Sequence, residues 1–193
     1  MVVIAVERLV LVRHAMPEVD PATPSDSWQL GHDGRAAARA LRSAVPEPMY
    51  PVASDEPKAL QTLQELTGRV EVPTDAGFRE VARPYEWSGS DYRQKARAYV
   101  EGARHSGWEP HERVAERFHA AVARYAEEAA TAGATLVIGT HGLAPTIWLT
   151  SLMPLHPSPA AFWVALAFPD VVDVDLPTRT ARRRADGGRT TAG

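Results

Sequence analysis

Short apolar runs alternate with helix-periodic segments along the chain. Residues 9–12 and 136–140 are continuous apolar runs rich in β-branched side chains, the pattern of strands buried on both faces. Residues 34–44 are rich in Ala and precede Pro46, which predicts a helix that ends before the proline. Residues 57–68 place apolar side chains on one helical face, with Pro in the first turn and Gly at the end. The same patterns predict strands at residues 51–54, 70–72, 162–168 and 171–176 and helices at residues 92–100, 110–133 and 143–152.

This alternation of strands and helices predicts an α/β fold: a three-layer sandwich with a mostly parallel central sheet and helices on both faces. The last predicted strand alternates Val172, Val174 and Leu176 with two Asp residues, as expected of a sheet edge with one solvated face. With 193 residues the chain has room for one such domain, which we place at residues 1–177. Residues 81–108 are broken by Pro and Gly and are predicted to form a lid or insertion in this domain.

The chain end has a different composition. Residues 178–193 hold five Arg and one Asp among Thr, Gly and Ala, which favours a flexible, solvated tail. A weak anion-binding arm is the alternative.

Composition excludes several kinds of chemistry. The sequence has no Cys, which rules out a disulfide scaffold, a Cys-ligated zinc and a thiolate nucleophile. The net charge of -3 gives no general attraction to nucleic acid or to an anionic membrane. The first residues lack the basic stretch of a signal peptide, and the late apolar run at 160–168 is far shorter than the ~20 residues of a membrane span. We therefore expect a cytoplasmic protein.

Charged and imidazole side chains follow the predicted strands. Arg13 and His14 follow the first strand, Lys58 lies in the helix after the second, and Glu80 and His141 follow later strands. The carboxyl ends of parallel strands share one edge of a sheet, so these groups are expected to converge there. Cations and imidazoles together suit a tetrahedral oxyanion, a His can attack phosphorus, and a carboxylate can protonate the leaving oxygen. Each residue taken singly also has an ordinary structural or solvated role.

Four segments, in order, resemble the motifs of the histidine phosphatase superfamily, which has the phosphoglycerate-mutase-like fold. They are Leu11-Val12-Arg13-His14-Ala15, Ser54-Asp55-Glu56-Pro57-Lys58-Ala59-Leu60-Gln61-Thr62, Phe78-Arg79-Glu80 and Val137-Ile138-Gly139-Thr140-His141-Gly142. The resemblance covers about residues 8–176. It implies that His14 is the nucleophile and forms a phosphohistidine. Arg13, Lys58 and His141 would hold the phosphoryl oxygens, and Glu80 would protonate the leaving alcohol. The scheme needs no metal and no other cofactor.

The sequence departs from the family pattern at four positions. Ala15 replaces a Gly, Gly31 replaces a helix-capping Thr, and Asp20 stands where many mutase-like members have Asn. A carboxylate at position 20 would repel phosphate, so its side chain is expected to turn away or to shape a different pocket. The main departure is Lys58, which replaces an Arg although the chain has 19 Arg and only two Lys. Lys offers a point charge where Arg would grip two oxygens.

The function predicted from these features is a metal-independent phosphomonoesterase acting on a small phosphorylated metabolite. The alternatives are a phosphoglycerate-type mutase and a non-catalytic relative that binds a phosphorylated ligand; a protein phosphoryl group as substrate also stays open. Arg83, three residues after Glu80, is the predicted substrate contact. The expected partner is a small-molecule phosphate ester, not nucleic acid or a membrane, and a homodimer is left open. The five other His residues form no ligand cluster, so no metal site is predicted.

Overall fold

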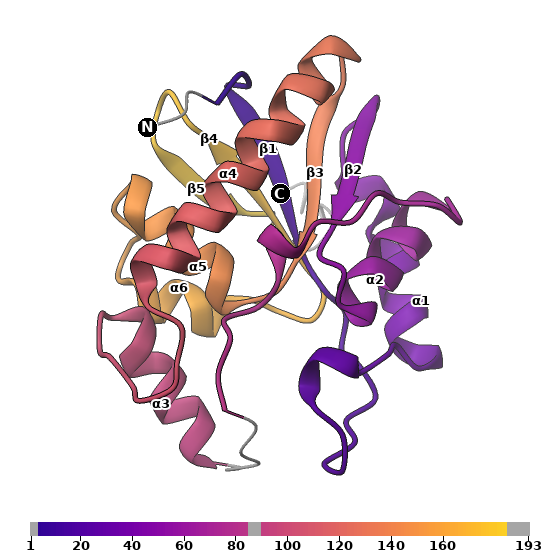
Figure 1. Ribbon diagram of the computed structural model, residues 1–193. Helices are drawn as coiled ribbons and strands as arrows, with labels where there is room; N and C mark the ends of the chain where they lie inside the picture. The colour runs from indigo at the N-terminus through magenta and orange to yellow at the C-terminus, as the bar shows by residue number, and fades with distance from the viewer. Residues whose placement is uncertain (1–3, 85–89, 185–193) are drawn as a thin grey trace, which may run out of the picture.

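A five-stranded sheet forms the centre of the molecule (Figure 1). The computed structural model describes residues 4–84 and 90–184. The strand order is β2-β3-β1-β4-β5. The strands are β1 (Arg8–Arg13), β2 (Met49–Ala53), β3 (Thr135–Thr140), β4 (Asp170–Asp175) and β5 (Thr180–Arg183). The first three run parallel to one another, β4 pairs antiparallel with β1, and β5 pairs antiparallel with β4.

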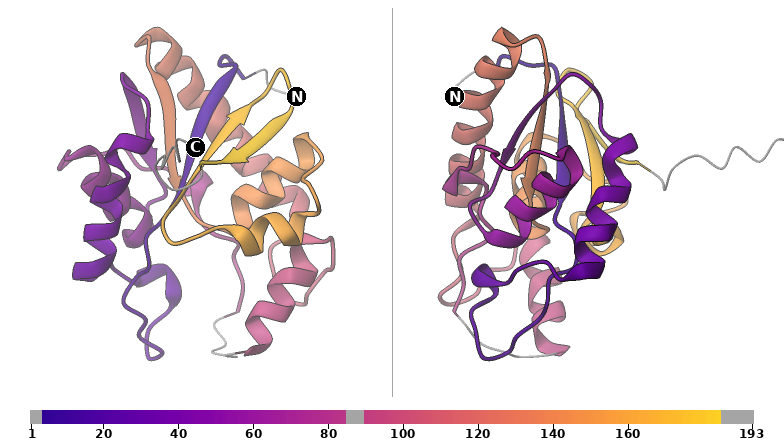
Figure 2. Two further views of the ribbon diagram at one scale, coloured as in Figure 1. Left: turned by 180° about the vertical axis from the view of Figure 1, so that it is seen from behind. Right: turned by 90° about the vertical axis from the view of Figure 1, so that its right-hand side faces the viewer.

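Helices cover both faces of this sheet, and Figure 2 shows α4 and α1 on opposite sides of it. The α-helices are α1 (His32–Ala40), α2 (Pro57–Thr67), α3 (Ser90–Val100), α4 (His111–Thr131), α5 (Leu143–Leu152) and α6 (Pro159–Ala165). Three short 3-10 helices are η1 (Ser25–Ser27), η2 (Leu41–Ala44) and η3 (Ala76–Phe78). The architecture is the predicted three-layer α/β sandwich.

Strand β1 separates the two halves of the core. Leu9 and Leu11 pack with the apolar faces of α4 and α5, whereas Val10 and Val12 pack with Leu63 and other side chains of α2. All four β1 side chains are at most 3% exposed. The continuous apolar pattern of the sequence is therefore explained by burial on both faces.

Two predicted strands are wrong. Residues 162–168 lie in α6 and in the loop after it, because Pro159 in the first turn and the Ser158 side chain, which accepts a hydrogen bond from the Ala161 N–H, start a helix there. Residues 70–72 form no strand either: Val70 is 86% exposed, and the isolated bridge to β2 that follows is made by Thr74 with Ala53, outside this segment.

The chain end also differs from the prediction. The expected edge strand β4 lies inside the sheet, because residues 180–183 pair with it as β5. Arg183 donates to Asp170 at 2.6 Å and Arg184 donates to Asp173 at 2.6 Å, so the Arg-rich segment neutralises the acidic positions of β4. The prediction of a flexible tail is therefore wrong for residues 178–184. Residues 185–193 lie outside the described part.

The predicted insertion at residues 81–108 contains α3, while residues 85–89 lie outside the described part. Among the residues that the structure describes, no helix combines the length and apolar character needed to cross a bilayer.

A close contact between β3 and α2 fixes the helix that carries Lys58. A Cβ atom on Gly139 would lie 2.7 Å from Leu63 Cγ and 3.2 Å from the Ala59 carbonyl oxygen.

We expect Gly139→Ala to lower the free energy of unfolding by about 1–3 kcal/mol, measured by urea denaturation, because α2 must move outward. Leu63→Ala provides the comparison: the double variant should lose less than the sum of the single losses. Additive losses would show that the contact does not constrain α2.

Candidate active site

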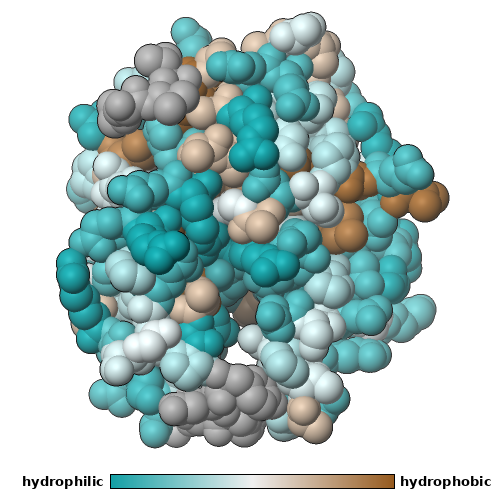
Figure 3. Space-filling view, in the orientation of Figure 1, coloured by the Kyte–Doolittle hydropathy of each residue, from teal (hydrophilic) through white to brown (hydrophobic). Residues whose placement is uncertain are grey.

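The predicted site residues meet at the carboxyl edge of β1 and β3. Arg13 is the last residue of β1 opposite Thr140, and the His14 N–H donates to the Thr140 carbonyl oxygen at 2.9 Å. The His14 and His141 rings then lie 5.2 Å apart, edge to face. Figure 3 shows a mostly hydrophilic surface around this edge, hollowed between α3 and η1. The prediction that parallel strands bring these groups together is therefore confirmed for the two histidines.

His14 is held by its backbone neighbours. Its Nδ1 lies 2.8 Å from the Ala15 carbonyl oxygen, which assigns the proton to Nδ1 and leaves the lone pair on Nε2. The Ala15 N–H donates to Thr62 Oγ1 on α2 at 3.0 Å. Burial first, then the neighbouring His141 and Lys58, lower the pKa of His14 well below its ordinary value. His14 is therefore a neutral imidazole with a free ring nitrogen, as a nucleophile requires.

Arg13 is a half-buried cation at the same edge. Its Nη1 donates to the Leu166 carbonyl oxygen at 2.6 Å, and its guanidinium carbon lies 3.5 Å from the centre of the Phe168 ring. Burial lowers the pKa of Arg13 to about 10, so it stays protonated at neutral pH. The Phe168 ring also lies 5.3 Å from the His14 ring. Sequence reasoning placed Phe168 at the end of a strand and missed it as a wall of the site.

Glu80 is bound to the N-terminus of α5. Its carboxylate accepts the backbone N–H groups of Gly142 (3.1 Å), Leu143 (3.0 Å) and Ala144 (2.8 Å). Burial opposes ionisation, but His141, Arg83 and these N–H groups outweigh it and lower the pKa of Glu80 to about 2. Glu80 is therefore a fixed carboxylate in the free protein.

Lys58 lies in the first turn of α2 and is paired inside the chain. Its Nζ donates to Glu56 Oε2 at 2.5 Å and to the Ser25 carbonyl oxygen at 2.7 Å. The Lys58 and Glu56 side chains are only 7% and 6% exposed. Sequence reasoning missed Glu56, although the sequence held one signal: a carboxylate two residues before the lysine of the motif.

His141 is fully buried against Ser54 and Glu56. Its Nε2 lies 3.0 Å from Ser54 Oγ and 3.4 Å from Glu56 Oε1. Because Ser54 Oγ accepts from the Glu56 N–H, its own hydrogen is free to be donated to Nε2. With that hydrogen donated to Nε2, the neutral ring carries its proton on Nδ1. Burial above all lowers the pKa of His141 to about 3, so the ring is neutral.

Two site nitrogens lack partners. Across residues 4–84 and 90–184, three buried side-chain nitrogens have no hydrogen-bond partner, and Arg13 Nε and His141 Nδ1 are two of them. Buried donors are almost always paired, so an unpaired donor marks a place where a ligand is expected. The two donors belong to residues that the family resemblance assigns to the phosphoryl group.

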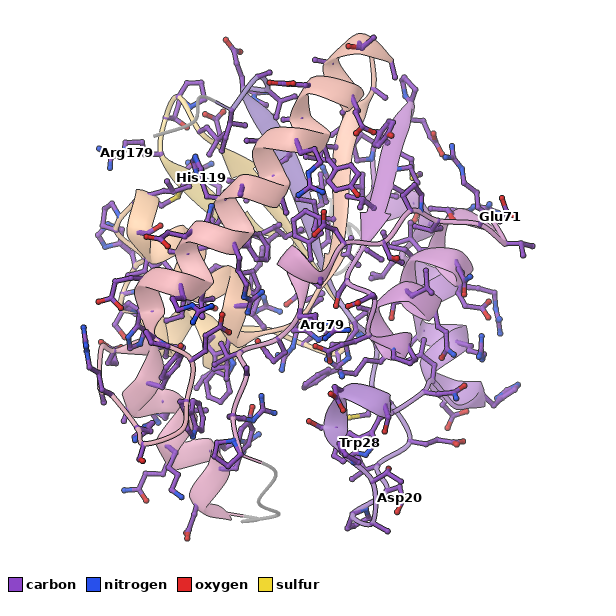
Figure 4. All side chains as sticks on the ribbon, viewed as in Figure 1. Asp20, Trp28, Glu71, Arg79, His119 and Arg179 are labelled. Carbon is purple, nitrogen blue, oxygen red and sulfur yellow. The ribbon has the colours of Figure 1, made fainter. Side chains whose placement is uncertain are left out.

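Arg83 and Asp20 were also singled out by the sequence. Arg83 donates to the Val81 carbonyl oxygen, and its guanidinium lies 5.0 Å from the ring centre of Tyr92 on α3. Its charge acts on both Glu80 and His141, which places it beside the site. Asp20 is exposed on a loop, labelled in Figure 4, and its side chain accepts from the Ala22 N–H at 2.9 Å. Asp20 therefore turns away from phosphate, the first of the two expectations for it.

Gly31 lacks a capping side chain at the start of α1, as its replacement of Thr implies, and a Cβ there would lie 2.4 Å from Glu18 Oε1. Within the described residues, no three His, Asp or Glu side chains are grouped so that they could hold a metal ion.

Comparison with known proteins finds relatives along most of the chain. The family model of the histidine phosphatase superfamily (branch 1) matches residues 9–167. The structure of TTHB049 from Thermus thermophilus has a TM-score of 0.62 and 25% identity, over 92% of this chain and 98% of that one. A mycobacterial glucosyl-3-phosphoglycerate phosphatase, in complex with inorganic phosphate, has a TM-score of 0.68 and 21% identity, over 95% and 98%. Mycobacterial hydrolase 1 has a TM-score of 0.67 and 22% identity, over 94% and 98%. No curated protein sequence matches the chain.

The buried neutral histidines make stability depend on pH. Below pH 6.5, His14 and His141 bind protons in the unfolded chain but stay neutral in the folded protein. For His141 this difference persists until the pH reaches its folded pKa of about 3. The contribution of these histidines to the free energy of unfolding is therefore fully present above pH 6.5. As the pH drops below 6.5, each histidine lowers this free energy by about 1.4 kcal/mol per pH unit. Urea unfolding at several pH values should give a shallower decline for His141→Asn. The exposed His32→Asn is the control, and an unchanged slope in His141→Asn would contradict the assignment.

Proposed function

The chain belongs to the histidine phosphatase superfamily, and within it we propose a metal-independent phosphomonoesterase that forms a phosphohistidine on His14. The proposed substrate is a small phosphorylated metabolite. The observation that carries this proposal is the pair of unpaired buried donors, Arg13 Nε and His141 Nδ1, beside the free Nε2 of a neutral His14. Phosphoryl transfer is catalysed mainly by preorganised hydrogen-bond donors that surround the oxygens where negative charge develops.

Three side chains would hold the phosphoryl oxygens. Arg13 offers Nε and His141 offers Nδ1. Lys58 uses two of its three N–H donors within the chain, which leaves one for a phosphoryl oxygen. This set binds oxygens by separate single hydrogen bonds and supplies the positive charge that a metal ion supplies in other phosphoryl-transfer sites.

The reaction would run in two displacements. The His14 Nε2 lone pair forms a bond to phosphorus while the bond from phosphorus to the leaving oxygen breaks, and that oxygen takes a proton delivered through Glu80. A water oxygen then attacks phosphorus and the P–N bond breaks, with the water proton passing to Glu80. The second step uses Glu80 in the ionised form in which the free protein holds it. We propose that the proton for the first step enters with the substrate, and that the proton taken up in the second step leaves Glu80 with the phosphate product, which returns Glu80 to its ionised form.

The name of a neighbour supports hydrolysis. A mycobacterial protein of the same fold is named a glucosyl-3-phosphoglycerate phosphatase, which favours a phosphatase over a mutase for this site. The non-catalytic alternative is disfavoured by a nucleophile and by phosphoryl-binding donors in the same buried place.

Trapping the intermediate tests the proposal. A panel of phosphomonoesters assayed in the presence of a chelator should release phosphate. When the phosphoryl group of the ester is labelled, an acid-sensitive label should appear on the wild-type protein after rapid denaturation in base. His14→Ala should lose the label and at least ~1000-fold in turnover, because the nucleophile is gone. His32→Ala, at an exposed histidine, should behave as the wild type. Label without phosphate release would indicate a mutase. No label and no turnover in folded protein would indicate the binding relative.

Arg83 is the proposed contact for the part of the substrate beyond phosphorus. Its guanidinium lies 5.0 Å from the ring centre of Tyr92, and its charge helps to lower the pKa of Glu80. Arg83→Ala should change the ranking of the phosphomonoesters by kcat/KM, with the largest loss for esters that carry a second anionic group. Arg104→Ala removes an exposed Arg paired with Glu112 and is the matched control. The same ranking of substrates in both variants would remove Arg83 from the substrate site.

A further inference from the structure

The buried carboxylate of Glu56 connects three of the five predicted site residues. Its Oε2 accepts from Lys58 Nζ at 2.5 Å. Its Oε1 accepts from the Glu80 N–H at 2.8 Å and lies 3.4 Å from His141 Nε2. A carboxylate that is 6% exposed beside an expected phosphate position is costly unless it is paired, and it repels a dianion. Its presence therefore needs a reason beyond packing.

Glu56 changes the charge that the site offers. Arg13 and Lys58 are the two cations of the phosphoryl-binding set. The buried Glu56 carboxylate bonds Lys58, and the half-buried Glu80 carboxylate acts on Arg13 through its charge. These four charges cancel, and both histidines are neutral because burial lowers their pKa values. Arg83 at the rim adds one positive charge. The site thus has a net charge of about one, which suits an anion of one charge better than an anion of two.

The other charged groups around Glu56 are mostly paired among themselves. Arg79 faces Glu56 from the loop after η3 and donates two hydrogen bonds to Asp55, at 2.6 and 2.7 Å. Asp26 of η1 faces Arg79, and Arg117 of α4 faces His141 while it donates to both carboxylate oxygens of Glu109. The Arg117–Glu109 pair adds no net charge, whereas Arg79 offsets Asp55 and leaves Asp26 as one further negative charge. This surplus negative charge also favours the singly charged anion.

We propose that Glu56 is a specificity-determining residue that makes this site select the singly charged, monoprotonated form of its phosphomonoester substrate. The proposal rests on the proposed function and deepens it. Glu56 acts through Lys58, whose charge it offsets, rather than by touching the substrate. The monoanion also brings the missing proton: it passes from a phosphoryl oxygen to the Glu80 carboxylate and on to the leaving oxygen, while the N–P bond forms and the P–O bond breaks. The products are the alcohol and a dianionic phosphoryl group on His14.

The pH dependence of turnover is the first test. For phenyl phosphate, wild-type kcat/KM should fall by about tenfold per pH unit above the second ionisation of the ester, which lies at about 6. In Glu56→Gln the Lys58 charge is no longer offset, so the ratio of kcat/KM at pH 8 to that at pH 5.5 should rise at least ~10-fold. Glu71→Gln removes an exposed carboxylate at the position labelled in Figure 4 and is the control, with the wild-type ratio expected.

Sulfate is the second probe, because it carries two charges throughout this pH range and its binding needs no turnover. By titration calorimetry, sulfate should bind Glu56→Gln at least ~10-fold more tightly than the wild type, and Lys58→Gln more weakly. The double variant Glu56→Gln/Lys58→Gln restores the charge balance, so its sulfate affinity and its pH ratio should return toward wild-type values while kcat stays low. Thermal unfolding of each variant checks that it is folded.

The outcomes separate this proposal from the one it rests on. Unchanged sulfate affinity and pH ratio in folded Glu56→Gln would overturn the role of Glu56, even if His14 carries the phosphoryl group. If Glu56→Gln does not fold, sulfate binding by Lys58→Gln that equals or exceeds that of the wild type would overturn it as well. Loss of the phosphohistidine with the expected sulfate changes intact would overturn the proposed reaction and leave the charge selection standing.

Discussion

The register in which β1 pairs with β3 decides where each reactive group lies. Arg13 stands opposite Thr140, so His14 and His141 leave the sheet side by side. A shift of one residue would turn every side chain of β1 to the other face, so that Leu9 and Leu11 would change sides with Val10 and Val12. The same edge receives the N-terminus of α5, which fixes the Glu80 carboxylate with three N–H groups. Nucleophile, donors and carboxylate are thus placed by the backbone rather than by flexible side chains.

Burial then sets the protonation state of these groups. Both histidines are kept neutral and Glu80 is kept ionised, although all three are enclosed. The carboxylate is ionised because His141, Arg83 and the backbone N–H groups together outweigh its lost hydration. For the imidazoles, the effect of burial outweighs the contacts that favour protonation. The Glu56–Lys58 pair follows the same rule, since each charge is buried only because the other is present. A lysine, with three separate donors, can serve this carboxylate, a backbone carbonyl and a ligand at once.

Much of this arrangement is readable from the sequence, and the exceptions have physical causes. The apolar runs of β1 and β3 and the helix after Pro57 are local patterns, so strand ends and the residues beyond them could be placed. A strand was wrongly predicted at residues 162–168, because a buried helix and a buried strand are equally apolar. Strand β5 is held to β4 by Arg183, which binds Asp170, and by Arg184 just after it, which binds Asp173, and composition does not reveal these contacts. The pairing of Glu56 with Lys58 depends on how α2 begins, which spacing alone does not fix.

The order of the strands has a consequence for synthesis of the protein. Strand β1 is made first, yet it lies between β3 and β4, which begin at Thr135 and Asp170. The carbonyl oxygen that receives Arg13 belongs to Leu166, and Asp170, at the end of the same loop, is bound by Arg183. On the ribosome, the earliest strand therefore has no neighbour until β3 has emerged, and it gains its second neighbour only with β4. An apolar β-strand in that position is prone to pair with other chains, so a nascent chain of this protein is a natural client for chaperones until its last strand is in place.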